Sequence, residues 1–159
     1  MKTFGERFGE SRGEPFEFAG KLVHAILERE VESGTKLQIV FHRFNPSVPQ
    51  ALDTVLEKGH LLIANQKFKK GAILWTETAP RVVEVVCITK LARTTFKAWN
   101  AWKDEDGITM AWIGNGGMLI EEREGVTVLK CSDGVGEPQF DDLVVEISGF
   151  GHRERSGIK

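Results

Sequence analysis

From His60 onward, apolar and polar residues alternate with a period of two through most of the chain. Such alternation sends successive side chains to opposite faces of a strand and is typical of a sheet with one buried face. Separators rich in Gly, Pro and Asp divide the pattern into short runs. The runs predict strands over 60–65, 72–79, 82–91, 95–103, 108–113, 117–122, 126–131 and 142–148. With no helical pattern between them, they indicate an antiparallel meander that must curl or partly close into a barrel.

The earlier part of the chain shows two helical patterns. Over 18–33, apolar residues recur three and four positions apart, and Gly34 follows as a stop signal. A second, shorter pattern covers 47–58 and is followed by Gly59. Between them, 36–44 alternates as a strand. We therefore predict an α+β fold, in which an N-terminal helix and a short second helix pack on a curved, barrel-like antiparallel sheet.

The length of 159 residues fits one domain. Residues 1–14 repeat a Phe-Gly-Glu element and are rich in glycine and charge, so we expect a flexible arm. Residues 150–159 are expected to form a loose tail. The single folded domain is then 15–149.

Composition excludes several classes of protein. A formal net charge of −2 argues against a protein that coats nucleic acid or an anionic membrane. No apolar run reaches the length of a membrane span, and the first residues lack the apolar segment of a signal peptide. We expect a cytoplasmic protein, bacterial in style, with no membrane partner.

Cys87 and Cys131 stand alone in strand-like runs, without a CxxC motif or a neighbouring histidine. This spacing does not make a zinc site. Two buried, reduced thiols are expected, and a disulfide between neighbouring strands is the alternative. The four histidines have no metal-ligand spacing either, so we expect no metal and no cofactor.

Three of the four tryptophans lie within 96–112. If a two-residue turn at 106–107 joins the flanking strands, Trp99 and Trp112 lie diagonally on one face of the hairpin. Trp102 then lies on the other face. Tryptophans on both faces cannot all enter one core unless both faces are covered.

Two interpretations of these rings stay open. In the first, one face of the hairpin packs under the helices and the other rings lie flat along the sheet, since aromatic side chains often simply fill cores. Alternatively, Trp99 and Trp112 form a hydrophobic platform or pocket wall, with Asn100 and Asn115 nearby to orient a ligand. We take the platform as the candidate site.

A pair of carboxylates suggests a rival function. Glu77 and Glu84 flank Pro80, and a turn centred on Pro80 would place them opposite each other. Two close carboxylates raise the pKa of one, as in acid–base dyads. The alternative is that the loop separates them or that an arginine neutralises them. A dyad would indicate a small hydrolase or isomerase in a half-closed β-barrel.

Basic residues form two groups in the sequence, Lys58, Lys67, Lys69 and Lys70, and Lys90, Arg93 and Lys97. With aromatic residues nearby, they make single-stranded nucleic-acid binding a third class, provided that both groups share one face. The acidic balance of the chain favours solvated hairpin tips instead, so we do not expect nucleic acid.

The preferred hypothesis is a non-enzymatic binding or interaction module. Its aromatic sheet face would bury an apolar small molecule or a protein partner. Because a sheet face without helices needs a cover, we also expect a homodimer.

Overall fold

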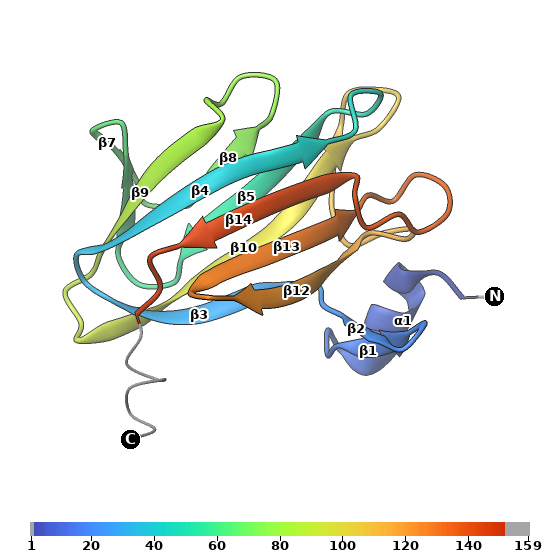
Figure 1. Ribbon diagram of the computed structural model, residues 1–159, viewed down its shortest axis with the longest axis horizontal. Helices are drawn as coiled ribbons and strands as arrows, with labels where there is room; N and C mark the ends of the chain where they lie inside the picture. Colours follow the sequence, from blue (N-terminus) through green and yellow to red (C-terminus); the bar gives the residue numbers. More distant parts are fainter. Residues whose placement is uncertain (1, 152–159) are drawn as a thin grey trace.

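The computed structural model describes residues 2–151, in which two antiparallel sheets pack face to face (Figure 1). The seven-stranded sheet consists, in spatial order, of β12 (Gly117–Arg123), β13 (Val126–Ser132), β14 (Leu143–Ser148), β4 (Thr35–Phe44), β9 (Val82–Ile88), β6 (His60–Ile63) and β7 (Gln66–Phe68). The five-stranded sheet consists of β11 (Thr109–Met110), β10 (Arg93–Lys103), β5 (Gln50–Leu56) and β8 (Ala72–Trp75), with β3 (Leu27–Glu32) paired to β10 on the edge opposite β5.

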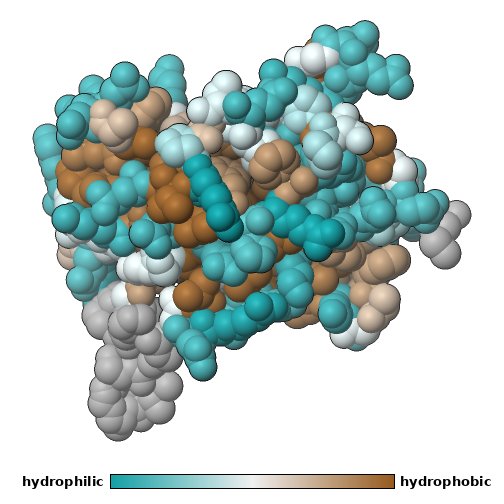
Figure 2. Space-filling view, turned by 45° about the horizontal axis from the view of Figure 1, so that its top comes forward, coloured by the Kyte–Doolittle hydropathy of each residue, from teal (hydrophilic) through white to brown (hydrophobic). Residues whose placement is uncertain are grey.

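The core lies between the two sheets because one face of each strand carries its apolar residues. In β4, for example, Leu37, Ile39 and Phe41 point inward and are buried, while Lys36 and Gln38 are exposed. Each fully buried side chain of this size contributes roughly 1.5–3 kcal/mol. The surface seen in Figure 2 is mostly hydrophilic, with hydrophobic patches between the polar side chains.

Helix α1 (Phe4–Ser11) and the hairpin of β1 (Phe16–Phe18) and β2 (Lys21–Val23) form a second, smaller cluster at one corner (Figure 1). The helix begins with a capping box, in which Thr3 and Glu6 bond to each other's backbone N–H. Its Phe4 and Phe8 rings are buried against Phe16, at centroid distances of 5.3 and 4.7 Å. The prediction that residues 1–14 form a flexible arm is therefore wrong for residues 4–11, which form this helix.

Both predicted helices are also wrong. Residues 18–33 contain the end of β1, β2 and β3, and residues 47–58 contain β5. The α+β class holds in a coarse sense, because the described residues are mostly antiparallel sheet with one helix. Among residues 2–151 neither large sheet closes on itself, so the predicted barrel-like closure is not found there. Within this part of the chain, no helix has the length and apolar character required to cross a membrane.

The eight strands predicted from residue 60 onward are all present, although several are shorter than predicted. Their order is not a meander. β8 and β9 are consecutive in the chain but lie in different sheets, and β14 pairs with β4. Phe150, assigned by prediction to a loose tail, is buried and lies 5.9 Å from the Phe96 ring. The rest of that predicted tail, 152–159, lies outside the described residues.

A buried polar cluster ties β5 to the loop between β13 and β14. Gln50 Nε2 donates to Asp133 Oδ2 at 2.8 Å, and the Asp133 backbone N–H donates to Asp142 Oδ2 at 3.0 Å. Asn45 Nδ2 donates to the other Asp142 oxygen at 3.3 Å. Burial raises the pKa of the Asp142 carboxyl, and the neighbouring Asp133 charge raises it further.

Candidate functional site

The outward side of the five-stranded sheet carries three of the four tryptophans. Trp99 on β10 lies opposite Asp53 on β5, which lies opposite Ile73 on β8. Opposed residues share a face of a sheet, so these side chains form one row across it. In the next row, Ala101 on β10 lies opposite Ala51 on β5, and Ala51 lies opposite Trp75 on β8. We call this surface, defined by Trp75, Trp99, Trp112, Asp53 and Ile73, the tryptophan face.

Trp112 joins Trp99 from the loop after β11. Its backbone has a φ of 61°, so the chain leaves the strand direction there. The indole Nε1–H donates to the Ala25 carbonyl at 3.0 Å, which fixes the ring. The Trp99 and Trp112 centroids are 4.9 Å apart with planes inclined by 37°. Trp112 is 41% exposed, and Trp99 is partly buried.

The predicted hairpin register is wrong by one residue, although the two rings do meet. Trp102 pairs with Met110 and Lys103 with Thr109, so five residues form the loop in place of two. Asp104 organises this loop, because its Oδ1 accepts from the backbone N–H groups of Asp106 and Ile108.

Trp102 belongs to the interior. It lies on the opposite side of β10 from Trp99 and is 2% exposed. A Cβ atom at Gly116 or Gly134 would come within 2.4 Å of its ring. Glycine in the β11–β12 loop and glycine in the β13–β14 loop therefore leave room for the indole, and Trp102 fills the core.

Asp53 is the polar centre of the tryptophan face. Burial raises the pKa of its carboxyl, and a backbone hydrogen bond at Thr54 acts in the opposite direction. Among the described residues, no cation forms an ion pair with it. A ligand group that donates a hydrogen bond or carries positive charge would be favoured beside this carboxylate.

Lys103 closes one side of the face. Its ammonium group lies 4.7 Å from the Trp75 ring centroid, a cation–π distance, and 4.0 Å from Glu77 Oε1. The candidate carboxylate Glu77 is therefore exposed at the rim and held near a lysine. Glu84 lies on β9 in the other sheet and pairs in register with Gln38. The structure does not bring Glu77 and Glu84 together in the hairpin that a dyad requires.

The two predicted asparagines also lie elsewhere. Asn100 points inward, is 3% exposed, and donates to the Ser132 carbonyl at 2.9 Å. Asn115 donates to the Gly136 carbonyl at 2.8 Å and accepts from the Phe4 N–H at 3.3 Å. Both side chains hold parts of the fold together and do not reach the tryptophan pair.

The tryptophan face continues around β8 into a hollow of about 720 Å³. Ile73 and Trp75 belong to the tryptophan face and also line this hollow. The β6–β7 hairpin and β9 form the wall of the hollow opposite β8. The lining is mostly apolar, with Glu84 among its few polar side chains. The volume is within the range of small-molecule sites.

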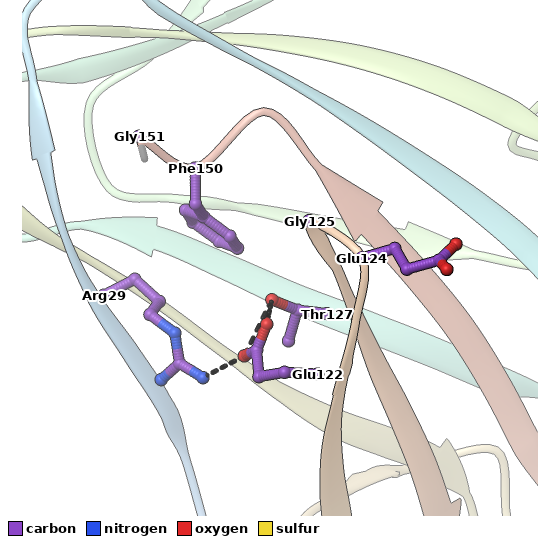
Figure 3. Close-up of a pocket in the computed structure, with 7 residues that line it drawn as sticks. All are labelled: Arg29, Glu122, Glu124, Gly125, Thr127, Phe150 and Gly151. Carbon is purple, nitrogen blue, oxygen red and sulfur yellow. Dashed lines mark hydrogen bonds and ion pairs between the residues drawn. The ribbon is translucent and has the colours of Figure 1, made fainter. Parts of the chain in front are cut away.

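A different hollow, of about 470 Å³, is lined in part by Arg29, Glu122 and Thr127, whose polar groups bond to one another (Figure 3). Glu122 accepts from Arg29 Nη2 at 2.6 Å, and Thr127 Oγ1 lies 3.0 Å from each of its oxygens. Arg29 Nη1 also donates to the Glu28 carbonyl. Because β3 and β12 belong to different sheets, this arrangement acts as a clamp between them, and we do not assign it as the site.

Comparisons of the chain with protein-family models, with curated proteins and with solved structures found no match. The assignment of function therefore depends on the geometry of the tryptophan face.

Proposed function

We propose that this protein is a non-enzymatic binding module whose tryptophan face holds a ligand with an apolar surface and a hydrogen-bond donor. The observation that carries this proposal is the partly exposed Trp99–Trp112 pair beside the Asp53 carboxylate. Indole rings offer a large, rigid apolar surface to a flat ligand. Asp53 supplies the directional contact that apolar burial alone lacks.

The energetics of Asp53 support a ligand with a donor group. The half-buried Asp53 carboxylate, which pairs with no cation within residues 2–151, has lost part of its hydration, which is why its pKa is raised. A donor from a ligand would restore a hydrogen bond and offset that cost. Trp99 and Ile73 on either side would exclude water from the new contact.

The four indole N–H groups provide the test. In ¹⁵N-labelled protein each gives one resonance, assigned by single Trp→Phe variants. In a screen of uncharged aromatic and cyclic polyol fragments, binding should shift the resonances of Trp99 and Trp112 and leave that of Trp102 unchanged. Asp53→Asn should weaken the hits that carry a donor, and Val135→Ala, which removes an exposed apolar side chain outside the face, should not.

Quenching of tryptophan fluorescence by acrylamide is a second measurement of the tryptophan face. Trp112 should contribute most to quenching and Trp102 least, because they are 41% and 2% exposed. Fragments that bind while the Trp75, Trp99 and Trp112 resonances stay in place would contradict the proposal.

A second copy of the chain is another occupant that we propose for this face. The exposed Trp112 and Ile73 would then be buried in a homodimer. Sedimentation should show a dimer for the wild type and a monomer for Trp99→Ala. A monomer at all concentrations would leave the small ligand as the occupant. A cytoplasmic location remains part of this proposal.

One observation favours an enzyme as the second candidate. Asp53 faces the same surface as Trp99 and Trp75, and its raised pKa suits an acid or base of a small hydrolase or isomerase. Turnover of a screening hit that Asp53→Asn abolishes, with binding retained, would establish this function in place of simple binding.

A further inference from the structure

A separate hollow, of about 590 Å³, lies where the chain crosses between the two sheets. It is formed by the β5–β6 loop, the β6–β7 hairpin with the first residue after β7, and the β9–β10 loop, the last visible at the left of Figure 1. Four lysines line it, namely Lys58, Lys67, Lys69 and Lys90. We call it the lysine hollow.

The charge of the lysine hollow is unbalanced. No carboxylate lines it, and within residues 2–151 none of its four ammonium groups forms an ion pair. Other basic residues on the five-stranded sheet are paired, since Lys97 lies 3.3 Å from Glu57 and Arg93 lies 3.1 Å from Glu30. Four like charges around one hollow repel one another, and an anion between them would relieve that repulsion.

Strand pairing and a close backbone approach hold these lysines together. Lys67 lies opposite Leu62 in the β6–β7 hairpin, and β6 also pairs with the end of β9 that leads to Lys90. The Lys58 backbone N–H donates to Thr94 Oγ1 at 3.0 Å. Gly59 has a φ of 128°, and a Cβ there would meet the Ile88 carbonyl oxygen at 2.1 Å. The loop that carries Lys58 therefore depends on glycine to lie against β9.

We propose that the lysine hollow binds a compact polyanion of the oligophosphate class. Ammonium groups act as point charges that suit phosphate oxygens from several directions. The hollow has the volume of a small-molecule site. The half-buried His60 adds a polar side chain, and the exposed Leu91 adds an apolar rim.

The surroundings favour a compact ligand over a nucleic-acid strand. Of the second basic group in the sequence only Lys90 lines the hollow, because Arg93 and Lys97 are engaged by glutamates of β3 and by Glu57. Glu28 and Glu30 lie on the outward side of β3 beside that group. A long phosphate backbone that left the hollow in this direction would meet these carboxylates.

Calorimetric titration with inorganic tripolyphosphate at 25 mM and 200 mM NaCl tests the proposal, with citrate and an oligothymidylate as competitors. The test variant is Lys67→Gln/Lys69→Gln. The control is Arg12→Gln/Lys21→Gln, which removes the same charge from exposed positions near α1 that form no ion pair within the described residues. Thermal unfolding of both variants checks the fold, and relief of repulsion should leave the melting temperature of the test variant unchanged or raised.

One tripolyphosphate should bind per chain, with an affinity that falls at the higher salt concentration. The test variant should bind roughly tenfold more weakly, and the control should match the wild type. Three results would overturn the proposal: no binding at 25 mM NaCl, equal weakening by the control variant, or citrate binding as tightly as tripolyphosphate. Oligothymidylate binding more tightly than tripolyphosphate would replace it with nucleic-acid binding. None of these results depends on the tryptophan face.

Discussion

Replacement of Gly134 by alanine is the perturbation that most directly tests how Trp102 is packed. The new Cβ would lie 2.4 Å from Trp102 Cζ2 and 2.8 Å from the Ile113 carbonyl oxygen. Non-bonded carbon atoms prefer about 3.5–4.0 Å, so the ring or the loop must move by roughly 1 Å. The ring has no free space, because it is 2% exposed and Gly116 approaches it as well. Overpacking of this kind costs about 1–3 kcal/mol of folding free energy.

A double-mutant cycle measured by urea unfolding separates this clash from other effects. Trp102→Phe removes the fused ring that meets the new Cβ, at a cost of about 1–3 kcal/mol for the cavity. In that background Gly134→Ala should lose most of its cost, which gives a coupling energy of about 1 kcal/mol or more. Gly9→Ala is the control, since no atom lies within 4 Å of a Cβ there and the residue is helical. That change should stabilise the protein by about 0.5–1 kcal/mol.

Additive effects of Gly134→Ala and Trp102→Phe would refute the reasoning, because they would show that the two positions are not in contact. A neutral Gly134→Ala would have the same consequence, since it would mean that the loop relaxes freely.

Three further predictions concern separate parts of the molecule. Thr3→Ala should destabilise the protein by about 1 kcal/mol through loss of the N-cap, measured by urea unfolding. Cys87 and Cys131 are free and buried, and burial raises the pKa of Cys87 to about 12, so neither thiol should react with DTNB at pH 8 until the protein is unfolded. Burial also raises the pKa of Asp53, so the folded state binds the Asp53 proton more tightly than the unfolded state does. Proton binding therefore stabilises the fold below the unfolded pKa of 3.8, and this stabilisation is lost as the pH rises through the higher pKa of the folded state. Asp53→Asn should remove that loss. If the free energy of unfolding depends on pH in the same way for wild type and variant from pH 3 to pH 7, the prediction is contradicted.

The sequence predicted the strands well where one face is uniformly apolar. It failed in β3 and β5 because polar residues occupy inward positions. In β3 the inward set is Leu27, Arg29 and Val31, and Arg29 reaches the edge of the sandwich to bond Glu122. Leu27 and Val31 alone are four residues apart, a spacing that fits a helix as well as a strand.

In β5 the alternation is hidden by Gln50 and Thr54, which are polar but buried. Gln50 Nε2 donates to Asp133 in the loop after β13, and Thr54 Oγ1 donates to the Ala72 carbonyl on the neighbouring strand β8. This error also concealed the central residue of the site. Once 50–56 is known to be a strand, Asp53 falls on the face opposite Leu52 and beside Trp99. Pairing between strands that are distant in sequence cannot be deduced from alternation, which fixes only which side chains share a face.

The sequence was sufficient to predict that Trp99 and Trp102 lie on opposite faces of the sheet, although it did not give the register of the strand pairing. Trp99 and Trp102 differ by an odd number of positions on one strand, so they must point to opposite sides. Asn100 and Asn115 were misplaced because neighbours in sequence were assumed to be neighbours on the surface. Asn100 directly follows Trp99 on β10, and because successive residues of a strand point to opposite faces, its side chain enters the core.

The position of β14 between β13 and β4 affects how the protein is made. β14 is the last strand of the described residues, yet it joins the two halves of the seven-stranded sheet. During synthesis, β4, β6 and β9 can pair early, but β4 must wait with an open edge until residues 143–148 have left the ribosome, and so must β13 once it has emerged. The nascent chain thus exposes apolar strand surface for most of its translation. We expect its yield in cells to depend on chaperones that shield such edges more strongly than its equilibrium stability would indicate.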